Sequence, residues 1–322
     1  MKKTSFACLA LAVPFLALTA CTAVNNLALS ANWYSRTNST INANTREELR
    51  YLVLFESSDG NNFLSYGEGS YTTVLSAENT VLAGGENETC YHLTSTLNIP
   101  VTYTVNGETE TFEDVVTSEV WFRDIRYSLA PVKSIKTVLS HSPVTVTPET
   151  TEDAYEMYDY TYTTTYNSDC TGATVQIDNR INDKSDTYEI ALSGSGTYFD
   201  NEQILFALRA VNPSSGITFR SVNPVTRQQA TVALTDAATS ASTTLNFSLN
   251  GAETAEHEIP AYTFSLSYSG GNGGLSQSYT YAALSDSNNN TYRNVLLRMD
   301  VPILHSLGTL RYTLSSAQFS EV

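Results

Sequence analysis

Apolar and polar residues alternate along most of the chain beyond residue 45. A period of two residues is typical of β-strands that bury one face and leave the other in water. The pattern is clearest in the segments 158–166, 188–192, 245–250, 262–268 and 295–301. In the first segment, Tyr158, Tyr160, Tyr162 and Tyr166 share one face and polar residues share the other. This division predicts an antiparallel sheet with one solvated face.

The connections between these segments have the composition of tight turns. Asn106-Gly107 separates two alternating runs, and both residues tolerate the positive φ angles of a two-residue hairpin. Asn250-Gly251 and the segments 270–274 and 286–290 are further turns. A meander of about a dozen strands must close on itself or curve around something that covers its apolar face. We therefore expect a mainly β protein with a large antiparallel curved sheet or half-barrel (an open barrel).

One segment has the features of a helix. Asp200 and Gln203 have the spacing of a capping box, and Asn212-Pro213 ends the pattern. The apolar stripe between them consists of Ile204, Leu205, Leu208 and Val211. A second capping box, Thr45 with Glu48, leads into a strand-like run at 51–55, so any helix there is brief. The pattern predicts one or two short helices in or near the concave face.

The N-terminus has the features of an export signal. Lys2 and Lys3 precede an apolar run at 6–18, which is too short to span a membrane comfortably. The run ends in Leu18-Thr19-Ala20-Cys21, which resembles the bacterial lipobox. We expect residues 1–20 to be a lipoprotein signal peptide and Cys21 to become the lipidated N-terminus. An ordinary signal peptide with a chance cysteine is the alternative.

Lipidation at Cys21 would anchor the protein to a membrane through acyl chains. The expected location is the cell envelope: the outer membrane or periplasmic face in a Gram-negative host, or the outer face of the plasma membrane in a Gram-positive host. Residues 21–45 are rich in Asn, Thr, Ser and Ala and predict a flexible tether after the lipidated cysteine. Residues 46–322 are expected to form a single half-barrel domain, with two domains as the alternative.

Composition limits the classes of partner. The hydrophobic content is 41%, which is enough to bury a core and excludes general disorder. The chain has 33 acidic and 17 basic residues, a net charge of −16. This acidic excess argues against nucleic acid or anionic lipid headgroups as main partners.

The cysteines predict a disulfide bond. Cys8 would leave with the signal peptide and Cys21 would carry lipid, so Cys90 and Cys170 remain as a pair in an oxidising compartment. A metal site is the alternative, but two cysteines without neighbouring histidines make a poor zinc site.

Motifs of catalysis are missing from the sequence. No Gly-x-Ser-x-Gly elbow, His-Glu-x-x-His helix, phosphate-binding loop or dinucleotide motif occurs. The four histidines are scattered, and we expect each to be a surface or hydrogen-bonded residue: His92, His141, His257 and His305. The sequence predicts no enzyme activity, cofactor or metal; a hydrolase is the alternative.

The last 60 residues follow a recognisable order of strands and turns. Tyr262 to Tyr268 leads to Leu284-Ser285-Asp286, then to Tyr292 to Met299, and finally to Leu307-Gly308-Thr309. This order resembles the C-terminal half of a family of uncharacterised exported bacterial proteins. The resemblance implies a β half-barrel similar to the lipoprotein carriers and acceptors of the Lol system. It also implies that an apolar ligand could occupy the concave face.

These observations lead to a functional prediction. We expect a non-enzymatic envelope lipoprotein that binds a lipid or another apolar ligand in its curved sheet. The alternative is a structural or protein-interaction lipoprotein with a fully packed core and an acidic working exterior. The residues expected to line a ligand cavity are Tyr158, Tyr160, Tyr162, Ile204, Leu208, Phe264 and Leu266. The tyrosines are also ordinary sheet residues with high β propensity.

Overall fold

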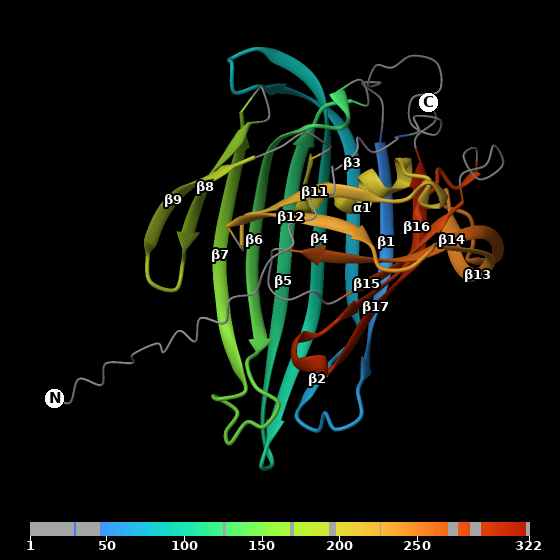
Figure 1. Ribbon diagram of the computed structural model, residues 1–322. Coiled ribbons are helices and arrows are strands. Elements are labelled where there is room, and N and C mark those ends of the chain that lie inside the picture. The colour runs from blue at the N-terminus through green and yellow to red at the C-terminus, as the bar shows by residue number, and fades with distance from the viewer. Residues whose placement is uncertain are drawn as a thin grey trace, which may run out of the picture.

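A computed structural model describes residues 29, 46–124, 127–167, 171–192, 198–225, 227–269, 276–283 and 291–319. The chain is mainly β, with strands of one large, strongly curved and mostly antiparallel sheet around a short helical segment (Figure 1). The predicted fold class is therefore confirmed. The signal peptide, Cys21 and nearly all of the tether lie outside the described residues.

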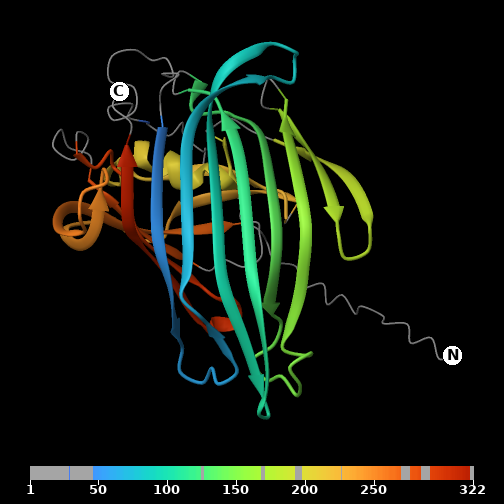
Figure 2. The ribbon, with the colours of Figure 1, turned by 180° about the vertical axis from the view of Figure 1, so that it is seen from behind.

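Long neighbouring strands form the main wall of the sheet (Figure 2). In spatial order they are β1 (Arg46–Ser57), β3 (Gly69–Val81), β4 (Asn87–Val105), β5 (Glu108–Phe122), β6 (Pro131–Pro143), β7 (Tyr155–Tyr166), β8 (Gly172–Asn179) and β9 (Lys184–Ala191). A short strand, β2 (Leu64–Tyr66), also pairs with β4. The β4–β5 hairpin turns at Asn106 and Gly107, whose φ angles are 53° and 88°, so the predicted turn is confirmed.

The C-terminal half of the chain extends the sheet from the other side of β1. It consists of β10 (Tyr198–Asp200), β11 (Thr218–Asn223), β12 (Gln228–Leu234), β13 (Thr239–Leu249), β14 (Ala255–Ser269), β15 (Gln277–Ala282), β16 (Leu296–Pro302) and β17 (Gly308–Phe319). β17 pairs with β1 along nearly its whole length, and β16, β15 and β14 follow in turn. β12 pairs with β14 and β11 with β12, and β10 lies parallel to β11 and next to β6. The sheet thus coils back onto its own concave face.

The predicted helix occupies that concave face. It is composed of η2 (Asn201–Gln203), α1 (Ile204–Ala207) and η3 (Leu208–Ala210), and it begins with the predicted capping box. The Glu202 amide donates to Asp200 Oδ1 at 2.8 Å, and the Asp200 amide donates to Gln203 Oε1 at 3.1 Å. We call residues 200–211 the plug. Two further 3-10 turns are η4 (Pro213–Ser215) and η5 (Leu304–Ser306). No helix begins at Arg46, because β1 starts there.

Alternation along the strands places different residues on the two faces of the main wall. On the convex face, five threonines lie side by side on β3 to β7: Thr72, Thr96, Thr117, Thr137 and Thr161. On the concave face, the main core collects side chains from the wall, from the plug and from β11 to β17. None of the described helices is long and apolar enough to cross a membrane.

The predicted disulfide is not seen. Cys90 is a free thiol buried against Leu82, Trp121 and Val132, and Cys170 lies outside the described residues. Burial, together with the negative charge of Glu88, raises the pKa of the Cys90 thiol to about 11. This thiol is therefore protonated and shielded at neutral pH, which is the behaviour of a structural core cysteine.

Candidate functional site

The concave face of the main wall has one row of apolar side chains that are only half-buried. Tyr71, Leu97, Val116, Val138 and Tyr160 are direct partners in the pairing of β3 to β7, and each is of intermediate exposure. We call these five residues the inner row. Large apolar residues four positions further along the same face, such as Leu75 and Leu93, are buried.

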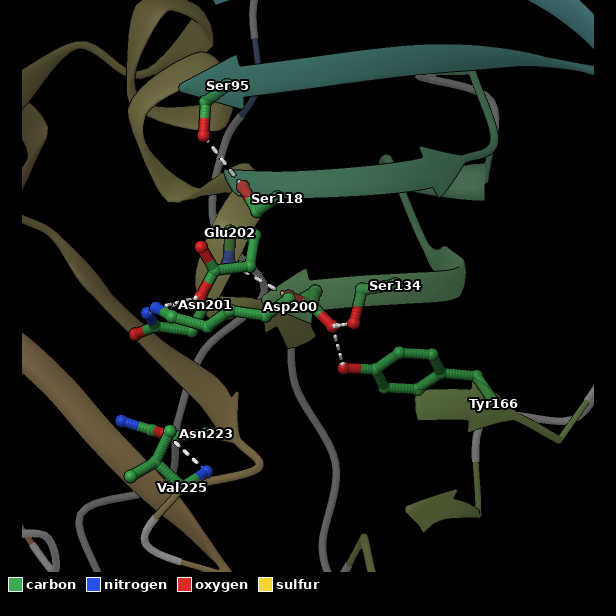
Figure 3. A network of polar contacts seen from close by, with 10 residues as sticks. Ser95, Ser118, Ser134, Tyr166, Asp200, Asn201, Glu202, Asn223 and Val225 are labelled. Carbon is green, nitrogen blue, oxygen red and sulfur yellow. Dashed lines mark hydrogen bonds and ion pairs between the residues drawn. The ribbon is translucent and has the colours of Figure 1, made fainter. Parts of the chain in front are cut away.

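On β3 to β6, a polar row lies next to the inner row on the side of the plug, and two of its residues, Ser95 and Ser118, are drawn in Figure 3. Thr73, Ser95, Ser118 and Lys136 are partners across β3 to β6. Ser95 and Ser118 lie 2.7 Å apart, and Lys136 Nζ is 2.8 Å from Glu202 Oε1 in the plug. Burial by itself would raise the pKa of Glu202, but the charge and hydrogen bond of Lys136 outweigh it and the net pKa is lowered. An ion pair therefore ties the start of the plug to β6.

Asp200 is the second connection between the plug and the wall. Its carboxylate is completely buried and accepts hydrogen bonds of 2.6 Å from Ser134 Oγ on β6 and from Tyr166 Oη on β7 (Figure 3). Burial, with the nearby charge of Glu202, raises the pKa of Asp200 to about 6, and the three hydrogen bonds only partly oppose this.

The C-terminal part of the plug is held by contacts with β1 and β15. Arg209 forms a buried ion pair with Glu47 on β1, in which Nη2 lies 3.0 Å from Oε2. Tyr281 Oη on β15 donates to the Leu205 carbonyl at 2.9 Å. The cavity between the plug and β1, β3 and β4 measures about 20 Å³, which is room for a single water molecule. The plug therefore fills its half of the interior.

A second, smaller core packs the opposite end of the half-barrel. It consists of Phe63, Leu64, Val101, Tyr103, Val105, Ala154 and Leu307, and we call it the rim cluster. The loop after β1 is held there by Asn61, whose side-chain amide donates to the carbonyls of Leu64 and Leu307 at 2.9 and 3.0 Å. The half-buried inner row lies between the main core and the rim cluster. Tyr71 and Leu97 pack partly against the main core, and Val138 and Tyr160 pack partly against a further core that contains Tyr162 and Val175.

The predicted tyrosines lie on the concave face of β7. The ring centroids of Tyr158 and Tyr160 are 6.3 Å apart, and those of Tyr160 and Tyr162 are 6.0 Å apart. Tyr162 is buried, whereas Tyr158 and Tyr160 are half-buried. Tyr158 Oη donates to Glu156, and Tyr160 Oη accepts from Asn179. Of the predicted set, Tyr160 belongs to the inner row and its two neighbours flank it.

The other four predicted residues pack in the main core. Ile204 and Leu208 of the plug and Phe264 and Leu266 of β14 are all buried there. They belong to the same core against which Tyr71 and Leu97 of the inner row pack. Sequence reasoning missed Tyr71, Leu97, Val116 and Val138. Each lies in an alternating segment, but only the pairing register of the strands brings the four together.

The histidines have partners of the kind expected. His92 contacts Glu78 and Glu119 at 2.9 and 3.0 Å. His141 Nδ1 lies 2.9 Å from Asp114 Oδ1, and its ring stacks on Phe112. Burial raises the pKa of Asp114, and the His141 contacts oppose that shift. The ring partners of both histidines are thus carboxylates, whereas a catalytic nucleophile would need to hydrogen-bond the imidazole. The described part of the chain contains no group of three potential metal ligands.

Comparisons with known proteins add little. No family model matches the chain, and no curated protein matches it either. Among solved structures, a crystal structure of a β-barrel-like protein of a domain of unknown function (DUF1849) from Brucella abortus aligns with 86% of this chain and 98% of that chain. The TM-score is 0.49 and the sequence identity 6%. A likeness at this level carries no argument about function.

Proposed function

We propose that this protein is a lipid-anchored, non-enzymatic binding module of the bacterial cell envelope, and that its inner row holds one apolar chain. The observation that carries the proposal is the inner row itself. Five apolar side chains stand in register across five strands and remain half-buried between two packed cores. Apolar surface that the fold covers only in part, as the neighbouring cores cover this row, supports a ligand groove.

The dimensions of the inner row select the class of ligand. Four strand intervals give it a length of about 19 Å, at about 4.8 Å per interval. Along each strand, the next side chain on the same face lies about 6.7 Å away. On the plug side of β3 to β6 that neighbour belongs to the polar row, and on β7 it is the buried Tyr162. An α-helix, with a diameter of about 10–12 Å, is too wide for such a strip. A single extended hydrocarbon chain, such as an acyl group, fits it.

Binding is tested on the chain from residue 22 onward, which contains every described residue. The purified protein is extracted with organic solvent to identify carried lipid, and a dansyl-labelled fatty acid is then titrated and displaced with palmitate. The expected result is displaceable binding. Failure to recover any lipid, together with no binding of the labelled probe, refutes the proposed ligand.

Two neighbouring residues give a matched pair of variants. Val116→Lys places a charge in the inner row, whereas Thr117→Lys places the same charge on the convex face of the same strand. We expect the first to weaken probe binding at least ten-fold, about 1.4 kcal/mol, and the second to leave it unchanged. Val138→Ser is a milder inner-row variant for the case in which Val116→Lys does not fold. Equal affinities for all three would exclude the inner row as the site.

The anchor is tested separately in cells. The apolar run at 6–18 and the cysteine at position 21 support lipidation. An alkyne-labelled palmitate should label the protein and the protein should fractionate with membranes, whereas the Cys21→Ala variant should do neither. A wild-type chain that remains unlabelled and soluble would contradict the anchor without affecting the inner row.

A further inference from the structure

An open cavity lies at the end of the half-barrel opposite Arg46, and its lining contains no residue of the inner row. Three segments meet there and form what we call the rim: residues 57–63, 104–110 and 144–154 (Figures 1 and 2). The Asn106 side chain joins two of them by donating to the Glu149 carbonyl at 2.9 Å. The cavity between them measures about 330 Å³. That is within the range of ligand pockets and much larger than the space beside the plug.

The cavity has a neutral, partly apolar lining. Val146 and Pro148 provide accessible apolar surface, with the buried Phe63 and Val105 of the rim cluster behind them, and Asn62, Thr104 and Asn106 provide amide and hydroxyl groups. Val146 and its neighbour Val144 are 51% and 44% exposed. These two valines add exposed apolar surface beside the cavity.

All charged side chains of the rim have the same sign. The three segments contain Asp59, Glu108, Glu110, Glu149, Glu152 and Asp153 and no lysine or arginine. Asp59, Glu108 and Glu149 each lie within two positions of a residue that lines the cavity, and all three are exposed. The cavity mouth is therefore surrounded by negative potential that attracts cations and repels anionic ligands.

We propose that the rim docks a short basic segment of another protein. An apolar side chain of that segment would enter the cavity, and its lysine or arginine side chains would contact Asp59, Glu108 and Glu149, which we call the acidic border. The cavity supplies the apolar contact and the acidic border supplies charge complementarity and a faster encounter. The volume suits a few side chains and not a whole domain. The rim lies at the Ser57 end of β1, opposite Arg46. This surface is independent of the inner row.

The probe is a peptide amide, Lys-Val-Phe-Lys, compared with Glu-Val-Phe-Glu. Both are titrated into the isotope-labelled chain from residue 22 onward, and backbone amide shifts are followed by NMR. We expect only the lysine peptide to shift the amides of residues 60, 104–106 and 146–147, with an affinity that falls as salt is raised. Equal shifts from both peptides, or shifts outside the rim, overturn the proposal.

Two double variants distinguish the effect of the acidic border on peptide binding from the effect of the protein's net charge. Glu108→Lys with Glu149→Lys reverses two border charges and should weaken the lysine peptide at least ten-fold. Glu253→Lys with Glu256→Lys makes the same change in net charge at exposed positions in and beside β14 and should alter affinity less than two-fold. Val146→Asn should weaken binding with no change in its salt dependence. Equal losses in the two double variants, or displacement of the peptide by calcium alone, would refute the proposal.

Discussion

The buried carboxylate of Asp200 should make the stability of the fold depend on pH in an unusual direction. The folded protein raises the pKa of this group from 3.8 to about 6, chiefly through burial. Between these two values the folded state holds a proton that the unfolded chain releases. The stability that Asp200 contributes is therefore complete below about pH 3.8 and is lost as the pH rises through 6. The difference between the pKa values of the folded and unfolded states corresponds to about 3 kcal/mol of free energy.

Asp200→Asn removes this titration and keeps the helix cap. Asparagine is as good an N-cap as aspartate, and its amide can exchange hydrogen bonds with the Ser134 and Tyr166 hydroxyls. The free energy of unfolding of the variant minus that of the wild type should therefore rise by about 3 kcal/mol from pH 4 to pH 7.5. Other carboxylates titrate in both proteins and cancel in this difference.

The assay is urea unfolding followed by circular dichroism at several pH values from 4 to 8. The control is Asp236→Asn, an exposed loop position that loses the same charge and should follow the wild type within about 0.5 kcal/mol. A difference between Asp200→Asn and the wild type that stays constant across the range would refute the assignment of a raised pKa to this group.

Further changes test the other contacts of the interior. Arg209→Met leaves Glu47 buried without its partner and should lower the free energy of unfolding in urea by about 3–5 kcal/mol. Adding Glu47→Leu should recover most of this loss, and no recovery would show that the loss does not come from the ion pair. Gly308→Ala should lower the midpoint of thermal unfolding, because an added Cβ would lie 2.3 Å from a ring carbon of Phe55; an unchanged midpoint would contradict this packing. Leu208→Ala should cost about 2–5 kcal/mol, and a cost below about 1 kcal/mol would show that the plug is loosely packed.

Local signals in the sequence predicted local structure well. The capping box depends on residues three positions apart, Asp200 and Gln203, and it forms as expected. The turn at Asn106-Gly107 follows from the φ preferences of two adjacent residues. The period-two alternation predicted a common face for Tyr158, Tyr160 and Tyr162, and their rings do lie side by side along β7.

Contacts between distant segments could not be predicted in this way. The ion pair of Arg209 with Glu47 joins residues 162 positions apart, and no periodicity relates them. The inner row depends on the register of five strands, because a slip of one residue would move Val116 to the convex face and Thr117 to the concave one. Phe264 and Leu266 were expected to line a cavity, but the pattern of a buried strand does not reveal whether a ligand or the protein itself covers it.

The pairing of β1 with β17 sets the order in which the domain can assemble. The partners run from Glu47 with Phe319 to Ser57 with Gly308, so the first strand finds its outer neighbour only at the end of the chain. Until the β17 segment is available, one edge of β1 is unpaired and the sheet cannot close. Such distant pairings make folding slow and leave partly built sheets prone to aggregation. An unfolded chain of this protein is therefore exposed to aggregation until β1 and β17 have paired.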